Sequence, residues 1–115
     1  MLFRSVFPDR EIVELSDDNP IFHTVYDLST RVQIPGSAWF GRGYKRPQYP
    51  ENAEDGKGAH WRAIYDDKGR VMVAISYNSD IGDAWEYADN IRYPEKFADQ
   101  SIRMGVDFII YSMTH

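Results

Sequence analysis

Apolar and polar positions form their clearest pattern in the middle of the chain, where two apolar runs flank a short polar turn. Residues 59–65 alternate, with Trp61 on one side and His60 on the other, as expected of a strand with one buried face. Residues 70–77 are apolar at consecutive positions, which is typical of a strand covered on both faces. The turn between the runs ends at Gly69, a residue suited to a left-handed backbone. The pattern predicts a β-hairpin.

A helical spacing of apolar residues follows. We expect this helix to begin at Pro94, because proline is favoured at the first helical position. Its inward stripe is expected to consist of Phe97, Ala98, Ser101 and Ile102. Gly105 is expected to end the helix. Residues 106–113 are largely apolar and predict a final buried strand, after which the sequence reaches His115.

The N-terminal part of the chain contains shorter elements. Residues 1–7 have the apolar spacing of the last turns of a helix, which Pro8 would end. Residues 11–15 predict a short strand bounded by turn residues. Residues 21–26 fit a short strand or a helical turn. Acidic and amide residues ahead of Pro20 favour the helical turn, because these side chains cap helices.

Together these elements predict an α/β fold, namely a partial three-layer sandwich with a β-hairpin, a helix and a final buried strand. A strand covered on both faces needs neighbours on both sides, so the sheet is expected to extend beyond this chain. We therefore interpret residues 1–115 as the C-terminal portion of a single α/β domain whose N-terminal half is missing. Residues 35–58 are rich in glycine and proline and are expected to form a long irregular loop.

Composition excludes several classes of function. A chain of 115 residues with 43% hydrophobic content can form the core of one domain. Its formal charge of −5 argues against general binding to nucleic acids or anionic membranes. The basic and aromatic cluster at residues 41–46 is therefore better explained as a solvated loop than as an RNA-binding patch. The absence of cysteine excludes disulfides, thiolate metal ligands and a cysteine nucleophile.

The most informative segment is the polar stretch at residues 76–89, which follows the second predicted strand. Acidic and aromatic residues are interleaved there, as in many binding sites. The candidate ligand-binding residues are Asn78, Asp80, Asp83, Trp85 and Glu86, together with the histidines His60 and His115. Carboxylates spaced by three residues could converge on a hard cation. Gly82 stands one position too early for an EF-hand loop, however, and no metal site and no cofactor are assigned.

Two alternatives remain for these candidates. Asp80 or Asp83 could instead cap a helical turn that runs through Trp85, which is a purely structural role. His60 or His115 could form a general acid–base pair with a carboxylate, or could serve the structure alone. The sequence contains no metal-binding histidine spacing and no GxSxG motif that would favour a particular reaction.

Several blocks of the chain occur in the order of a known family. These are residues 21–28, residues 60–70, the pattern Asn-x-Asp-x-Gly-Asp-x-Trp-Glu at residues 78–86, and residues 103–115. The chain closely resembles the C-terminal half of the bacterial family called Domain of Unknown Function 4159. The resemblance implies a flavodoxin-like α/β sandwich similar to class I glutamine amidotransferases, without the catalytic thiol of those enzymes.

The same resemblance indicates a cellular setting. Members of the family are often envelope proteins with export signals, so a periplasmic or cell-envelope location is expected. Their genes often lie near those of MoxR-type ATPases and von Willebrand A-domain proteins, which are therefore the expected partners. We expect a non-catalytic interaction or ligand-binding module. The alternative is a hydrolase-like or metal-assisted enzyme that uses the acidic loop at residues 78–86 with a histidine.

Overall fold

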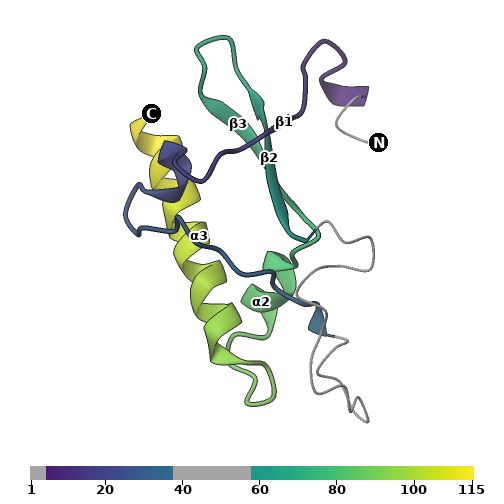
Figure 1. The fold of residues 1–115 in the computed structure, drawn as a ribbon, viewed down its shortest axis with the longest axis vertical. Helices are drawn as coiled ribbons and strands as arrows, with labels where there is room; N and C mark the ends of the chain where they lie inside the picture. Colours follow the sequence, from purple (N-terminus) through teal and green to yellow (C-terminus); the bar gives the residue numbers. More distant parts are fainter. Residues whose placement is uncertain (1–4, 38–57) are drawn as a thin grey trace.

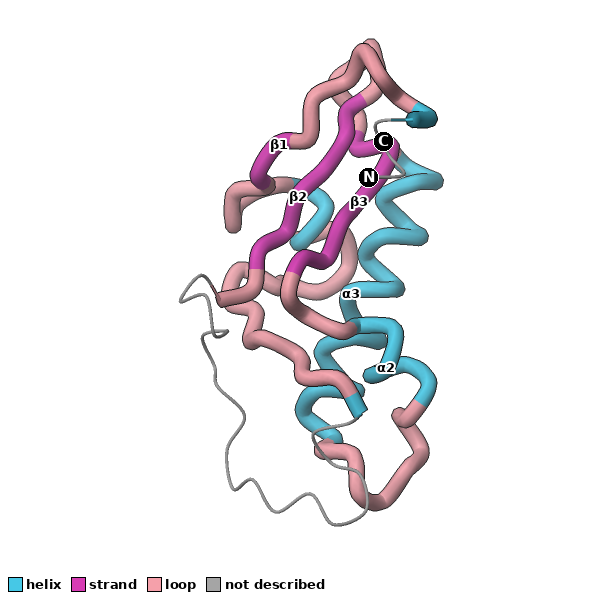
Figure 2. Tube along the Cα trace, turned by 90° about the vertical axis from the view of Figure 1, so that its right-hand side faces the viewer, coloured by secondary structure: helices cyan, strands magenta, loops and turns pink. Residues whose placement is uncertain are grey.

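The computed structural model describes residues 5–37 and 58–115. They form a mixed α/β structure in which a small antiparallel sheet, with strand order β1-β2-β3, lies beside a long helix (Figures 1 and 2). The α/β class predicted from the sequence is confirmed. The elements in chain order are β1 (Val13–Glu14), the 3-10 turn η1 (Pro20–Phe22), β2 (His60–Tyr65), β3 (Val71–Tyr77), α2 (Ile81–Glu86) and α3 (Glu95–Thr114).

Two predicted segments are described only in part. The loop expected at residues 35–58, with its basic cluster at residues 41–46, lies mostly outside the described residues, which stop at residue 37 and resume at residue 58. The helix end expected at residues 1–7 is described from residue 5, and Ser5 and Val6 are helical.

The predicted hairpin is confirmed, with β2 and β3 as its arms. Asp66 organises the turn, because its Oδ1 accepts hydrogen bonds from the backbone N–H groups of Lys68 and Arg70, both at 2.9 Å. Gly69 has a φ of 75°, the left-handed conformation that glycine adopts without steric cost. Local turn chemistry therefore fixes the connection between the strands.

The prediction that the second arm is covered on both faces is wrong. Among the described residues β3 pairs only with β2, as an edge strand, and its exposure alternates along most of its length. Met72 is 41% exposed. On β2, Trp61 and Ala63 face the core, and Ile64 on the opposite face is also buried. A run of apolar, mostly β-branched residues favours extended backbone whether or not both faces are covered.

The first strand and the following turn agree with the sequence pattern. β1 pairs with β2, and the N–H of Leu15 donates to the carbonyl oxygen of Trp61 at 2.8 Å. The helical alternative for residues 21–26 is confirmed at their start by η1. Asn19 caps this turn, because its Oδ1 accepts a hydrogen bond from the N–H of Ile21 at 3.1 Å.

The final strand predicted at residues 106–113 is wrong, since α3 continues through these residues as one helix. Its buried positions keep a helical spacing throughout: Phe97, Ala98, Ser101, Met104, Asp107 and Tyr111. Ile109 and Met113 fall outside this spacing and are 62% and 75% exposed. Ile102 is half exposed, contrary to its predicted place in the inward stripe. Apolar residues on several sides of a helix produce the same continuous run as a buried strand.

Gly105 does not end the helix as predicted but lies in its interior, where it has a packing role. A Cβ atom at this position would lie 3.4 Å from Cζ2 of Trp85, a residue of α2. The Nε1 of Trp85 donates a hydrogen bond to the carbonyl oxygen of Ser101 at 2.7 Å. A side chain larger than a methyl group at Gly105 would therefore displace Trp85, so the small residue keeps α2 close to α3. The predicted start of the helix is correct to within one residue, with Pro94 at the cap position.

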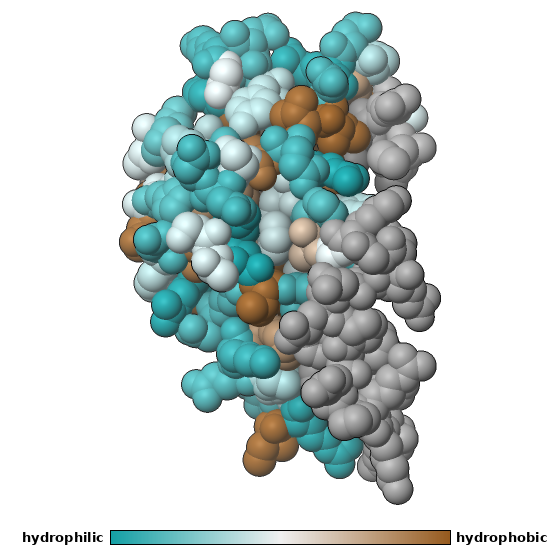
Figure 3. All heavy atoms as spheres, viewed as in Figure 1, coloured by the Kyte–Doolittle hydropathy of each residue, from teal (hydrophilic) through white to brown (hydrophobic). Residues whose placement is uncertain are grey.

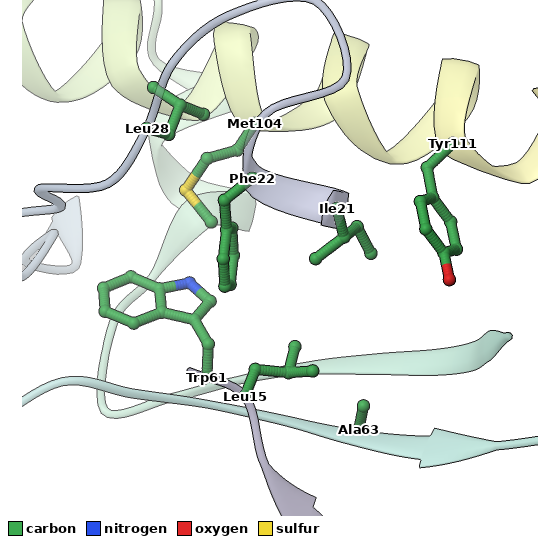
Figure 4. Close-up of a cluster of buried hydrophobic side chains, with 8 residues drawn as sticks. All are labelled: Leu15, Ile21, Phe22, Leu28, Trp61, Ala63, Met104 and Tyr111. Carbon is green, nitrogen blue, oxygen red and sulfur yellow. The ribbon is translucent and has the colours of Figure 1, made fainter. Parts of the chain in front are cut away.

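Two hydrophobic clusters lie along α3. The first, drawn in Figure 4, consists of Leu15, Ile21, Phe22, Leu28, Trp61, Ala63, Met104 and Tyr111. Its centre is an edge-to-face pair of Phe22 and Trp61, with ring centroids 6.4 Å apart. The second consists of Ile34, Ala84, Tyr93, Phe97 and Ala98. Because α3 contributes residues to both clusters, it joins the two ends of the core.

The outer surface is mixed in character. The face seen in Figure 3 is largely hydrophilic, with separate apolar spots. Within residues 5–37 and 58–115, no helix is long and apolar enough to cross a membrane.

Candidate functional site

Two carboxylates of the acidic motif, which we define as residues 78–86, accept hydrogen bonds from backbone amides. Asp80 stands immediately before α2, and its Oδ1 accepts a hydrogen bond from the N–H of Asp83 at 2.9 Å. The helix-cap alternative is therefore confirmed for Asp80. Asp83 turns to another segment of the chain, where its Oδ2 accepts a hydrogen bond from the N–H of Ser37 at 2.7 Å.

Residues 34–37 are held against this motif by further hydrogen bonds. The N–H of Asp80 donates to the carbonyl oxygen of Ile34 at 2.7 Å, and the N–H of Ile34 donates to Oγ of Ser79 at 2.9 Å. A Cβ atom on Gly36 would lie only 3.2 Å from Oδ2 of Asp80. Glycine at this position therefore permits the segment to pass close to the carboxylate.

Asn78 holds a second segment of the chain. Its φ is 58°, a left-handed conformation that asparagine tolerates better than most residues. Its Nδ2 donates a hydrogen bond to the carbonyl oxygen of Gly58 at 2.9 Å, and its own carbonyl oxygen accepts one from Nε2 of Gln33. With Ser37 bound to Asp83, the motif fixes the chain on both sides of residues 38–57.

The other two candidates in the motif reach the surface. Trp85 is 46% exposed even though its indole N–H is bonded to α3. Glu86 is exposed, and no described residue forms an ion pair or hydrogen bond with it. Asn78 and Asp80 are exposed as well, but their side chains are engaged in hydrogen bonds to the backbone.

The candidate histidines lie apart from the acidic motif. The Nδ1 of His60 is 2.7 Å from Oε1 of Glu14 on the neighbouring strand. His115 follows the C-terminal end of α3, where its ring stacks on Tyr111 with centroids 4.5 Å apart. No three histidine or carboxylate side chains of the described residues are close enough together to hold a metal ion. The structure therefore does not combine Asp80 or Asp83 with a histidine.

A polar depression of about 360 Å³ lies next to the start of β2. Its polar lining residues are Glu14, Asp17, Ser29, Thr30, Arg31 and His60. The carboxylate of Glu14 is shared between two neighbours, since its Oε1 contacts His60 and its Oε2 accepts a hydrogen bond from Nε of Arg62 at 3.0 Å. Burial is the largest single influence and raises the pKa of Glu14, but the hydrogen bonds to Arg62 and His60 and their positive charge together outweigh it and lower the pKa below its ordinary value.

Arg31 forms one wall of this depression, and the sequence did not indicate it. Its guanidinium carbon lies 3.6 Å from the ring centroid of Phe22 and 4.5 Å from that of Trp61. Its NH2 donates to Oδ1 of Asp17 at 2.7 Å, while only 3% of the side chain is exposed. Burial lowers the pKa of Arg31, an effect that Asp17 opposes. A lone arginine in an irregular segment carries no sequence signal, because its aromatic neighbours come from distant parts of the chain.

The arrangement is suited to recognising polar groups. The polar depression is lined by carboxylates, hydroxyls, an imidazole and a guanidinium, so a ligand finds both hydrogen-bond donors and acceptors there. Trp61 and Arg31 give it a rigid base, since aromatic and guanidinium groups stack favourably. Of the candidates predicted from the sequence, His60 alone lies among the described lining residues. Asn78 does not line the depression, but its hydrogen bond to Gly58 holds the chain just before β2.

Comparison with known proteins identifies one family. The family described as Domain of unknown function (DUF4159) matches residues 1–113, nearly the entire chain. Neither the curated proteins nor the solved structures provide a match. The motif at residues 78–86, which carried the resemblance, lies within the matched region. The chain therefore belongs to the DUF4159 family.

Proposed function

We propose that this chain is a non-catalytic interaction module that binds polar groups of a protein partner at the polar depression. The observation that carries the proposal is the hydrogen bonding of Asp80 and Asp83. Both carboxylates accept backbone N–H groups, and neither is paired with a histidine. In this arrangement the acidic motif supports a binding surface and is not itself a reaction centre.

The polar depression supplies the surface that the proposal requires. The carboxylates of Glu14 and Asp17 are exposed within one concave area, with Arg31 buried behind Asp17, which favours recognition of a partner carrying complementary charge. The lining is more polar than that of most small-molecule sites, which are mainly apolar. A polar protein surface is therefore a better match than a hydrophobic small ligand.

The cellular setting of the proposal rests on the family resemblance. A bacterial envelope-associated system is the proposed context, with a MoxR-type ATPase or a von Willebrand A-domain protein as the partner. The flavodoxin-like sandwich, and the place of this chain in the C-terminal half of that fold, are proposed on the same basis.

An enzymatic role is the second candidate, and one observation favours it. His60 and Glu14 form a close carboxylate–histidine pair at 2.7 Å, the arrangement in which a carboxylate orients a general base. This pair lies in the polar depression and not at the 78–86 loop.

Calorimetric titration with the purified candidate partners tests the proposal. Glu14→Gln removes the charge shared by His60 and Arg62, and should weaken the partner Kd by about tenfold, equivalent to about 1.4 kcal/mol. Asp99→Asn is the matched control, because it also neutralises an exposed carboxylate paired with an arginine, here Arg103 on α3. Equal Kd values for the two variants, or no binding by a folded wild-type chain, would count against the proposal. Ester hydrolysis that disappears in His60→Ala would support the enzymatic alternative.

A further inference from the structure

Both ring nitrogens of His23 contact oxygen atoms that accept hydrogen bonds. Nδ1 lies 3.0 Å from Oδ1 of Asp27, and Nε2 lies 2.8 Å from the backbone carbonyl oxygen of Asp17. A neutral imidazole carries one N–H and can donate to only one of these oxygens, whereas the protonated ring donates to both. The two contacts of His23 together therefore require the charged form of the ring.

The charge of Asp27 stays constant over the pH range in which histidine side chains titrate. The backbone N–H of Ser29 is the main cause that holds the pKa of Asp27 below its ordinary value. The hydroxyl of Ser29 and a protonated His23 act in the same direction, and desolvation opposes them. Asp27 is therefore ionised from about pH 5 to pH 8, where histidine changes its charge. The proton that decides this contact belongs to His23.

Other charged groups surround this turn but do not bind the ring. On the neighbouring segments they are Asp18 and Arg31, and on α3 they are Arg103 and Asp107. Each is engaged elsewhere, as Arg31 is with the carboxylate of Asp17 at 2.7 Å. Within the part of the chain that the structure describes, Asp17 and Asp27 alone bind the ring of His23. The protonation of this ring therefore controls both contacts.

His23 connects two parts of the lining of the polar depression, although it does not line the depression itself. Its Nε2 holds the backbone at Asp17. Its Nδ1 holds Oδ1 of Asp27, the same oxygen that accepts a hydrogen bond from the N–H of Ser29 at 3.2 Å. Asp17 and Ser29 both line the depression. The protonated ring therefore fixes these two lining residues relative to each other.

We propose that protonation of His23 regulates partner binding at the polar depression. The protonated ring keeps Asp17 and Ser29 in the arrangement that binds the partner. Loss of the proton leaves one ring nitrogen with a lone pair that faces an oxygen, so this contact opens and the lining loosens. Binding is therefore tighter at mildly acidic pH than at mildly alkaline pH. The regulated site is that of the proposed function, on which this inference rests.

Amide hydrogen exchange of the full chain without a partner tests the connection made by His23. The N–H of Leu28 donates to the carbonyl oxygen of Phe22 at 2.8 Å and closes the turn that contains His23. After correction for the intrinsic pH dependence of exchange, its protection should be about fivefold lower at pH 8 than at pH 5.5, as expected for the loss of one hydrogen bond. His23→Gln should give equal protection at both pH values.

Calorimetric titration with the purified MoxR-type ATPase and von Willebrand A-domain candidates at the same two pH values tests the regulation. The ratio of the Kd at pH 8 to the Kd at pH 5.5 should be about fivefold larger for the wild type than for His23→Gln. This comparison removes any pH dependence contributed by His60, the histidine in the lining.

His115→Gln is the matched control. It also removes a histidine, but one that lies outside the lining and stacks on Tyr111 of α3. This variant should keep the wild-type pH dependence in both measurements. Circular dichroism verifies that both glutamine variants fold.

Three outcomes would overturn the inference. The first is equal protection of Leu28 at both pH values in the wild type, which would show that the ring does not hold the turn. The second is a ratio of Kd values that is the same in the wild type and in His23→Gln, which would leave the proposed function intact. The third is the absence of binding by the folded wild type at either pH, which would overturn the proposed function as well.

Discussion

At the residue scale, buried polar side chains hold distant segments together. Asp107 lies fully buried in α3, and its Oδ1 accepts hydrogen bonds from the N–H groups of Val25 and Tyr26, both at 2.9 Å. Its Oδ2 is buried and has no hydrogen-bond partner among the described residues. The residue therefore fixes the turn after η1 to the helix, at the cost of one unsatisfied oxygen.

Substitution of Asp107 should separate the contribution of its hydrogen bonds to Val25 and Tyr26 from the cost of its unsatisfied oxygen. Asp107→Leu leaves two backbone N–H groups without an acceptor and should lower the free energy of unfolding by roughly 3 kcal/mol. Asp107→Asn keeps an acceptor oxygen and should cost about 1 to 2 kcal/mol. Urea unfolding of the three proteins measures the difference. Equal losses for both variants would mean that the contacts to Val25 and Tyr26 contribute little.

Asp66 gives the hairpin turn a dependence on pH. The backbone N–H of Arg70 holds the pKa of Asp66 below its ordinary value. Desolvation opposes this, and the side chain of Arg70 and the N–H of Lys68 act in the same direction as the Arg70 N–H. Because the pKa is lowered in the folded state, the stabilisation is fully present above the unfolded pKa of about 4. It is lost as the pH falls through the lower, folded pKa.

Comparison with Asp66→Asn isolates this contribution. The difference in unfolding free energy between the wild type and Asp66→Asn should be constant from neutral pH down to about pH 5, and should shrink below about pH 4. Chemical unfolding at a series of pH values provides the measurement. A difference that grows on acidification would show that the charge of Asp66 destabilises the turn.

At the element scale, features that depend on residues close together in the sequence could be predicted, whereas features that depend on contacts between distant residues could not. The hairpin turn ending at Gly69 was predicted, and Asp80 and the residues ahead of Pro20 were among the candidate helix caps, because each feature depends on residues only a few positions apart. The second half of α3 was not predicted, because an apolar run that follows a glycine such as Gly105 fits a strand equally well. Only contact with Trp85 assigns that glycine a packing role. The site at Arg31 was missed because its aromatic neighbours, Phe22 and Trp61, are identified only by contacts in the folded chain.

Substitutions at Gly105 test the continuity of α3. Gly105→Ala should raise the free energy of unfolding by up to about 1 kcal/mol, because alanine is the better helix former and its Cβ would make an ordinary contact with Trp85. Gly105→Leu should instead displace Trp85 and break its hydrogen bond to Ser101. Tryptophan fluorescence and thermal unfolding report the two effects. A leucine variant with unchanged stability and unchanged fluorescence would contradict the packing role.

At the scale of the whole molecule, α3 makes the two hydrophobic clusters interdependent. Met104 belongs to the first cluster and Phe97 to the second, and both are buried on the same helix. Met104 and Phe97 therefore anchor α3 in one cluster each, and loss of either anchor weakens a helix on which the other cluster depends. The chain should unfold as one cooperative unit even though its core is divided.

Truncation of each anchor tests this coupling. Met104→Ala and Phe97→Ala should each lower the free energy of unfolding by about 2 to 5 kcal/mol. In both variants far-UV circular dichroism and tryptophan fluorescence should report the same single transition. Two separate transitions in either variant would show that the clusters unfold independently.

The position of α3 also affects how the chain folds during synthesis. The strands and η1 are made before any residue of the helix, yet Met104 and Tyr111 complete the cluster in which Trp61 and Phe22 are buried. A nascent chain that has only just produced β3 therefore exposes these aromatic side chains together with an uncharged strand. Until α3 is complete, the growing polypeptide presents the kind of surface that chaperones recognise.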